Sequence, residues 1–414
     1  MSSVYILGGA QTDFARNWNR EGKTLIALLN EVVKSALIDV DINFEDINKL
    51  SSDNRVEFFV GNFIGEKFID QGHLGSFMTE VSPRFFGVPS SRYEAACASS
   101  SVAIDAAKSK ILSGERDVAI VVGWELMKTV SSKDCGNILG YASYYERESK
   151  NLDFPFPKLF GKLATETVKK YNLNKKSYLS ALSKIAVNNY SNAKLNPLAQ
   201  TRNWFMNYKQ ANSRGTSTNP FVGDMLASSD CSQITDGAAV VVLASTSYVK
   251  DKGLKNKPKI KGWGHRNAPI LFDKKIDESK NHKYILPWTR QAVLDAYESS
   301  GLSVKDIDVF ETHDCFTSSE FVALSCFGLC KPGDEIKLIN DGSIEISDSS
   351  PVNPSGGLIG CGHPVGASGA RMLLDCYRQV TSRAGAYQVD KSKNALMLNI
   401  GGSATTNYVY IVGC

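Results

Sequence analysis

Cys97 is the residue in this 414-residue chain best placed to act as a covalent nucleophile. It lies among small residues at the expected start of a helix, where free backbone N–H groups and the helix dipole stabilise a thiolate. Small neighbours also let an acyl group approach the sulfur. A cysteine at a helix start is more often a buried structural residue. The assignment therefore depends on partners elsewhere in the chain.

His313 and Cys315 are candidate partners for such a nucleophile. They belong to the run His313-Asp314-Cys315-Phe316, which follows a predicted strand at 308–312. Function collects at strand ends in open α/β sheets. Because strand side chains alternate with a period of two, His313 and Cys315 are expected to point the same way. One could hold a thioester oxygen while the other moves a proton.

His363 lies in a glycine-rich stretch at 353–369. Glycine brings the backbone close to a ligand, and Pro364 fixes the chain beside the imidazole. The chain has only five histidines, and His313 and His363 are the two in such contexts. A further glycine pair, Gly401-Gly402, follows the last apolar strand. It could supply a backbone N–H to an oxyanion, or it could be a simple turn.

The elements that must position these residues repeat along the chain. Each half is predicted to contain an apolar strand, an amphipathic helix, a turn and a second strand, and later a helix that leads into another strand. Strands alternating with helices, with continuous apolar runs, argue for sheets covered on both faces. The predicted domains are an N-terminal half at 1–122 plus 232–250, a loop domain at 123–231, and a C-terminal half at 255–414.

The inserted segment 123–231 is rich in Tyr, Asn, Ser and Lys, and it is predicted to be irregular and partly helical. It holds fifteen Lys and Arg against eight Asp and Glu, whereas the rest of the chain is slightly acidic. A solvated surface is the plainer interpretation of this excess. The alternative is a segment that meets an anionic ligand.

Composition excludes several classes of protein. The chain is 43% hydrophobic and 22% charged, which is ordinary for a globular protein. It contains no apolar run long enough for a membrane helix and no signal-peptide pattern. A net charge of +4 without a basic stripe does not indicate nucleic-acid binding. Nine irregularly spaced cysteines suggest reduced thiols, so we expect a cytoplasmic protein.

Taken together, the motifs resemble those of a thiolase, and the resemblance covers essentially the whole chain. More narrowly, the sequence is similar to the sterol-carrier-protein type and archaeal-type thiolases, which carry His-Asp-Cys-Phe. In chain order the motifs are Ala96-Cys97-Ala98-Ser99, Ser232-Gln233-Ile234-Thr235-Asp236-Gly237-Ala238-Ala239, His313-Asp314-Cys315-Phe316, Asn353-Pro354-Ser355-Gly356-Gly357, Gly362-His363-Pro364 and Gly401-Gly402.

The resemblance implies a fold and a reaction. The fold would be two duplicated α/β halves packed as a five-layer αβαβα sandwich with an inserted loop domain. The reaction would be reversible Claisen condensation or thiolytic cleavage of 3-ketoacyl-CoA. The partners would be acyl-CoA, acetyl-CoA and CoA, with no cofactor and no metal. The resemblance also implies a role in lipid and fatty acid metabolism, a homodimer or dimer of dimers, and a loop domain that binds the nucleotide end of coenzyme A.

The resemblance also implies residue roles. Cys97 would be acylated, and His363 would activate it and help to bind the thioester oxygen. His313 would complete that oxyanion site, and the backbone N–H groups of Cys97 and Gly401 would form a second one. Ordinary thiolases take an acid/base cysteine from the position that is Asn399 here, so that role passes to Cys315.

Two rival functions and a metal site remain as alternatives. Ser100 replaces a glycine that is common in thiolases and could narrow the acyl pocket. With Asn399, it makes a catalytically idle acyl-CoA binding or assembly subunit conceivable. A decarboxylating ketoacyl synthase would use Cys97 with the two histidines and would not need Cys315. Cys326 and Cys330 could hold a metal, but their apolar surroundings favour core packing.

Overall fold

Long apolar runs form the central strands of the structure, a computed structural model that describes residues 3–414. The strands are β1 (Tyr5–Gln11), β2 (Val56–Gly61), β3 (Ser90–Tyr93), β4 (Val118–Glu125), β5 (Gly237–Ala244), β6 (Lys259–Asn267), β7 (Val309–Thr312), β8 (Asn394–Gly401) and β9 (Thr406–Gly413). Strands β2, β4 and β5 are buried along their whole length, because helices cover both faces of the sheet.

Two groups of strands correspond to the two predicted halves. The order is β3-β2-β4-β5-β1 in the first group and β6-β9-β8-β7 in the second. A single residue pair, Tyr5 with Lys259, joins β1 to β6. The apolar run at 238–243 predicts a strand that returns after the insertion, and β5 is this strand, antiparallel between β4 and β1. Strands β3 and β9 were not predicted from the sequence.

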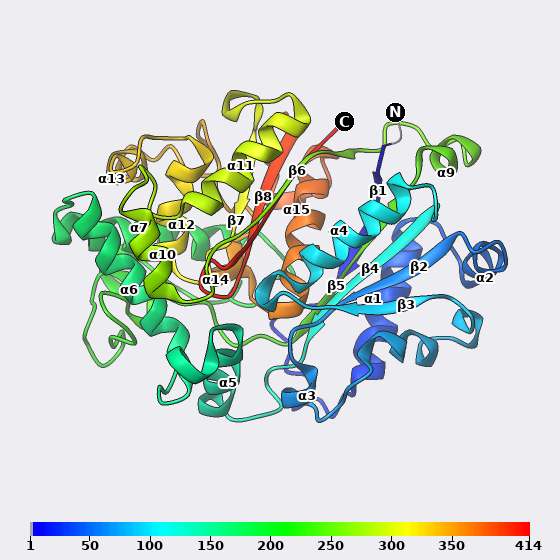
Figure 1. The fold of residues 1–414 in the computed structure, drawn as a ribbon, viewed down its shortest axis with the longest axis horizontal. Helices are drawn as coiled ribbons and strands as arrows, with labels where there is room; N and C mark the ends of the chain where they lie inside the picture. The colour runs from blue at the N-terminus through cyan, green and yellow to red at the C-terminus, as the bar shows by residue number, and fades with distance from the viewer. Residues whose placement is uncertain (1–2) are drawn as a thin grey trace.

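The helices complete a layered arrangement (Figure 1). Helix α1 covers one face of the first group, and α4 and α15 cover the other face. Helix α15 also packs on β8 and β9 of the second group, whose opposite face is covered by α11. The helices of the two halves are α1 (Leu25–Asp39), α2 (Phe44–Ser52), α3 (Gly65–Phe68), α4 (Ser99–Leu112), α9 (Thr246–Asp251), α10 (Phe272–Ser279), α11 (Pro287–Ser300), α12 (Thr317–Phe327), α13 (Glu335–Asn340), α14 (Gly357–Cys361) and α15 (Ser368–Val380).

The insertion between β4 and β5 is more helical than its composition suggests. It contains α5 (Ser132–Leu139), α6 (Pro155–Lys170), α7 (Lys175–Ala193) and α8 (Tyr208–Ala211). Helix α7 packs against α12, α13 and α14 of the C-terminal half. The apolar residues of α7 are buried and stabilise the helix, although the insertion as a whole has a polar composition.

Two glycines let α4 approach the sheet closely. A Cβ on Gly61 would lie 2.5 Å from the Cα of Ser100, and one on Gly123 would lie 2.8 Å from the Cβ of Ser100. Only glycine permits this contact with β2 and β4. The close packing fixes the start of α4, and with it Cys97, at the ends of these strands.

Two further findings concern the chain as a whole. All nine cysteines lie within residues 3–414, and none of them forms a disulfide. No helix in the described part of the chain combines the length and the apolar composition needed to cross a bilayer.

Candidate active site

Cys97 occupies the short helical turn Ala96–Ala98 that leads into α4. Ala96 has a φ of 51°, in the left-handed region, so the backbone turns sharply just before the nucleophile. Burial raises the pKa of the Cys97 thiol to about 12, although the backbone N–H groups of Gly402 and Cys97 donate toward the sulfur and oppose that rise. The resting residue is therefore a thiol that needs a base.

His363 is placed to be that base. Its Nδ1 lies 2.7 Å from the Ser368 Oγ, and the Ser368 hydroxyl donates to the Pro364 carbonyl at 3.0 Å. Because the hydroxyl has one hydrogen, Ser368 accepts from Nδ1–H, and the lone pair of His363 is on Nε2. Burial, and then the charge of Arg371, lowers the pKa of His363 to about 3, so the ring is neutral near pH 7.

His313 follows β7 directly and lies against His363. The ring centroids are 5.2 Å apart with the planes at 84°. Its Nδ1 is 3.1 Å from the Asn399 Nδ2, and its buried Nε2 makes no hydrogen bond with any of residues 3–414. Burial is the main cause that lowers the pKa of His313 well below its usual value. The charges of His363 and Arg371 act in the same direction.

These three residues converge although 266 positions separate the first from the last. The Cys97 sulfur and one ring nitrogen from each histidine lie within 4.8 Å of one another. The structure thus brings both predicted partners, His313 and His363, next to Cys97. A neutral imidazole base beside a thiol can transfer the thiol's proton as the sulfur attacks a carbonyl.

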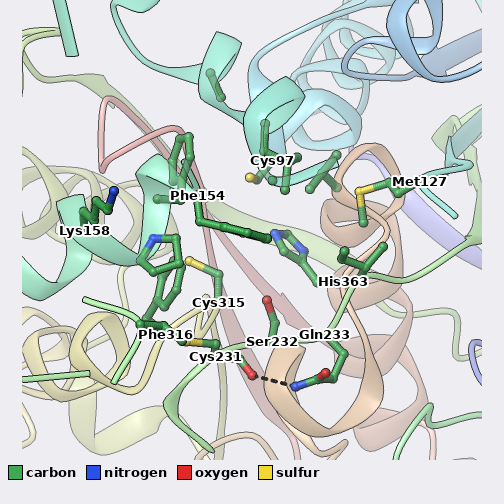
Figure 2. Close-up of a pocket in the computed structure, with 18 of the residues that line it drawn as sticks. Cys97, Met127, Phe154, Lys158, Cys231, Ser232, Gln233, Cys315, Phe316 and His363 are labelled. Carbon is green, nitrogen blue, oxygen red and sulfur yellow. Dashed lines mark hydrogen bonds between the residues drawn. The ribbon is translucent and has the colours of Figure 1, made fainter. Parts of the chain in front are cut away.

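Cys315 reaches the same site from the other side of a cavity of about 530 Å³ (Figure 2). Figure 2 shows the sulfur atoms of Cys97 and Cys315 at this cavity, with His363 beside them. Burial is the largest cause that raises the pKa of Cys315 well above its usual value, and the nearby Cys97 adds to it. Cys315 is therefore a protonated thiol that can donate its proton to a reacting carbon.

Two carboxylates that were not singled out from the sequence hold the active-site segments in place. Asp314 accepts from the backbone N–H groups of Leu358 and Ile359 and from the amide of Asn189, which ties the His313–Cys315 segment to α14 and α7. Glu125 accepts from the backbone N–H groups of Phe63 and Gly366. Each buried carboxylate fixes loops from distant parts of the chain.

Two expectations from the sequence concern residues close to Cys97. Gly402 presents its N–H to the Cys97 sulfur, and it directly follows Gly401, the expected oxyanion donor. Gly401 is the last residue of β8, and its α-carbon packs against the Ala95 carbonyl. The expectation that Ser100 narrows the acyl pocket is wrong. Ser100 is fully buried and does not line the cavity, and its hydroxyl accepts from the Ala370 N–H.

The described residues contain one group of three side chains with metal-ligating atoms close together, Cys97, His313 and His363. Cys326 belongs to no such group in the described chain, and its sulfur lies against the Leu286 carbonyl in the core. Its position agrees with core packing. Within the group of Cys97, His313 and His363, the Nδ1 of His313 is hydrogen-bonded to Asn399, and the Nδ1 of His363 is hydrogen-bonded to Ser368.

The pH dependence of Cys97 alkylation tests its protonation state. With the pKa raised to about 12, the rate with iodoacetamide should rise about tenfold per pH unit between about pH 6 and about pH 9, without a plateau. The modified peptide is quantified by mass spectrometry, and the urea-unfolded protein is the control, in which the rate should level off above about pH 8.5. A rate in the folded protein that is flat from about pH 6 would show a thiolate-imidazolium pair and contradict this assignment.

Comparison with known proteins shows the family to which the chain belongs. Family models described as "Thiolase, N-terminal domain" and "Thiolase C-terminal domain-like" match residues 4–205 and 274–414. An acetyl-CoA acetyltransferase of Methanocaldococcus jannaschii is 31% identical over 100% of this chain and 99% of its own. Human sterol carrier protein 2 is 27% identical over 99% of this chain and 72% of its own.

A solved structure titled "Ltp2-ChsH2(DUF35) aldolase" shares the fold. Its TM-score is 0.74 at 18% identity, and the match covers 100% of this chain and 98% of that one. Together the fold and the relatives define an acyltransferase. The chain belongs to the thiolase family, within which its relatives include archaeal acetyl-CoA acetyltransferases and sterol carrier protein 2.

Proposed function

We propose that this protein catalyses the reversible thiolytic cleavage of 3-ketoacyl-CoA through an acyl-Cys97 intermediate. The observation that carries the proposal is the placement of two thiols at one cavity, each with a different task. Cys97 has an imidazole base beside it and backbone N–H groups aimed at its sulfur. Cys315 is a buried, protonated thiol facing the same space.

In the first half-reaction, His363 Nε2 takes the proton of Cys97, and the sulfur attacks the 3-keto carbon. The backbone N–H groups of Cys97 and Gly401 stabilise the resulting oxyanion, with the N–H of Gly402 beside them at the sulfur. The bond between C2 and C3 then breaks, and its electron pair forms the enolate of acetyl-CoA, whose oxygen accepts from His313. Cys315 donates its proton to C2, which releases acetyl-CoA and leaves Cys315 as a thiolate.

In the second half-reaction, the Cys315 thiolate takes the proton of an incoming CoA thiol. The CoA sulfur attacks the acyl group on Cys97, and a new acyl-CoA forms. The departing Cys97 thiolate recovers its proton from the His363 imidazolium. The proton that Cys315 gave to C2 is replaced by the proton of the CoA thiol, and Cys97 recovers its own through His363. Each protein group therefore ends the cycle in its starting protonation state, and no redox cofactor is needed. Condensation is the same path reversed and predicts ping-pong kinetics.

The cavity suits an acyl-CoA thioester. Its lining is mainly apolar near Cys97, with Met127, Leu139 and Val365, and it extends to Lys158 and Phe221 of the insertion. We propose that the acyl group and the pantetheine arm occupy this space, with Lys158 on the side of the anionic nucleotide. The surplus of Lys and Arg in segment 123–231 supports this orientation.

The site argues against the rival functions. The same fold carries an aldolase, so the fold by itself does not determine the reaction. A decarboxylating synthase has no need of the thiol at Cys315. The idle-subunit alternative depended on Ser100 and Asn399. Both side chains have hydrogen-bond partners in the structure, and neither blocks the cavity.

We also propose a cellular location, an assembly state and a metabolic role for this protein. Nine free thiols suit a reducing compartment, which supports a cytoplasmic enzyme. The family resemblance supports a homodimer or a dimer of dimers and a role in lipid metabolism.

The proposal is tested by incubating the protein with acetoacetyl-CoA and CoA. We expect loss of the ketoacyl thioester, formation of acetyl-CoA, and a mass increase of one acetyl group on the peptide that contains Cys97. The protein without CoA is the control, in which the acetylated peptide should accumulate because the second half-reaction cannot proceed. Absence of both acetylation and turnover, with this substrate and with longer 3-ketoacyl-CoA thioesters, would favour the idle subunit.

A further inference from the structure

Asn399 lies in a buried chain of hydrogen bonds behind the active site. Strands β7 and β8 are parallel, and their register pairs Thr312 with Leu398. His313 follows Thr312, and Asn399 follows Leu398. The pairing of the two strands therefore brings the side chains of His313 and Asn399 together. Asn399 is fully buried, and its two polar atoms face different partners. The Ser101 hydroxyl donates to Oδ1 at 2.7 Å, and Nδ2 lies 3.1 Å from the Nδ1 of His313.

This arrangement determines which nitrogen of His313 carries the proton. An amide Nδ2 can only donate, so the Nδ1 of His313 must accept and cannot bear a hydrogen. The neutral ring then carries its proton on Nε2. That atom is buried and has no hydrogen-bond acceptor among residues 3–414. This N–H group lies beside the nucleophile and can donate a hydrogen bond to a bound substrate.

We propose that Asn399 is a positioning residue that holds His313 in the Nε2–H tautomer, so that His313 donates to the enolate oxygen of the thioester. This assignment rests on the proposed function. Asn399 stands at the position from which ordinary thiolases take an acid/base cysteine. In this protein its amide has a different role, which is to fix the tautomer of His313. Ser101 also helps to fix the tautomer of His313, because its hydroxyl orients the side-chain amide of Asn399.

The two active-site histidines are thereby held in opposite tautomers. Ser368 keeps the proton of His363 on Nδ1, which leaves Nε2 as a base. Asn399 keeps the proton of His313 on Nε2, which makes that atom a donor. Two identical side chains 5.2 Å apart therefore perform different tasks because their outer hydrogen bonds differ.

The tautomers can be read directly in the free enzyme by ¹⁵N NMR of protein labelled at histidine. Long-range proton-nitrogen correlations distinguish Nδ1–H from Nε2–H rings, and His313→Asn and His363→Asn variants assign the signals. We expect Nε2–H for His313 and Nδ1–H for His363. An Nδ1–H ring at His313 in the wild-type protein would overturn the proposal, whatever the activity of the enzyme.

Asn399→Asp tests the consequence for catalysis with almost no change in shape. A carboxylate accepts where the amide donated, so the His313 proton moves to Nδ1 and the donor is lost. Removal of one oxyanion donor lowers the rate about 10²-fold to 10³-fold, so we expect a loss of about 10²-fold in kcat at about pH 8 with a smaller change in KM. Asn196→Asp, which alters a buried amide outside the site, should retain wild-type kcat.

The pH profile separates positioning from a structural defect. At low pH the carboxylate introduced by Asn399→Asp and the His313 ring together bind one more proton, and Nε2 regains its hydrogen. The charged and titratable groups around His313 are His363, Arg371 and Cys97, with Cys315 across the site, and they are the same in both proteins. The ratio of variant to wild-type kcat should therefore rise as pH falls from about 8 to about 6.

These experiments distinguish a failure of the positioning role of Asn399 from a failure of the proposed function. A constant ratio of variant to wild-type kcat at all pH values, or unchanged kcat in Asn399→Asp, would refute the positioning role while leaving thiolysis intact. If the wild-type protein fails to cleave any ketoacyl thioester, the proposed function fails. The NMR measurement still reports whether Asn399 sets the tautomer.

Discussion

Cys97→Ala is expected to abolish thiolysis, with a loss of about 10⁴-fold or more in kcat, because no covalent intermediate can form. The sulfur is the only atom that accepts the acyl group in the proposed path, and neither histidine can replace it. Incubation of the variant with acetoacetyl-CoA should leave the mass of the peptide that contains position 97 unchanged. The measurement is the rate of ketoacyl thioester loss together with that mass.

The matched control is Cys330→Ala, which removes a partly buried thiol that lies outside the cavity. It should retain wild-type turnover and the acetylated Cys97 peptide. A Cys97→Ala protein that is folded, as judged by its circular dichroism and melting temperature, and still cleaves acetoacetyl-CoA would contradict covalent catalysis by Cys97. In that case another cavity thiol, such as Cys231, would have to be considered as the nucleophile.

Cys315→Ala is expected to lower thiolysis by about 10²-fold to 10⁴-fold, the usual range for a lost acid or base. Cleavage of the bond between C2 and C3 requires a proton at C2, and Cys315 is the thiol that faces the reacting atoms together with Cys97. Exchange of labelled CoA into acetyl-CoA breaks no carbon-carbon bond. Acetyl transfer to Cys97 should therefore persist in the variant, at a lower rate because Cys315 also takes the proton of the incoming CoA thiol.

The two assays on one variant make the result specific. Loss of cleavage with retained acetyl transfer supports proton transfer by Cys315, whereas loss of both would indicate a damaged site. Cys326→Ala is the control for removal of a buried thiol from the adjoining helix α12. If Cys315→Ala cleaves acetoacetyl-CoA at the wild-type rate, the assignment of the acid is wrong.

Much of the fold could be predicted from the sequence, because its signals are local. Apolar residues at three-residue and four-residue steps in 25–37 predict a helix there, and α1 extends two residues further. A helix is also predicted at 368–380, which are the bounds of α15. The insertion is predicted to be irregular and partly helical, yet α6 and α7 are long helices, because their buried contacts lie in other segments.

By itself the sequence determined the types of reactive side chain and their motifs, including Cys97, His313, Cys315 and His363. Only the tertiary structure showed which atom of each can react. It showed that the N–H of Gly402 faces the Cys97 sulfur, and it buried Ser100 behind the nucleophile. A tautomer depends on the partner of the other ring nitrogen. For His313 that partner is Asn399, 86 residues away, brought there by the parallel pairing of β7 with β8.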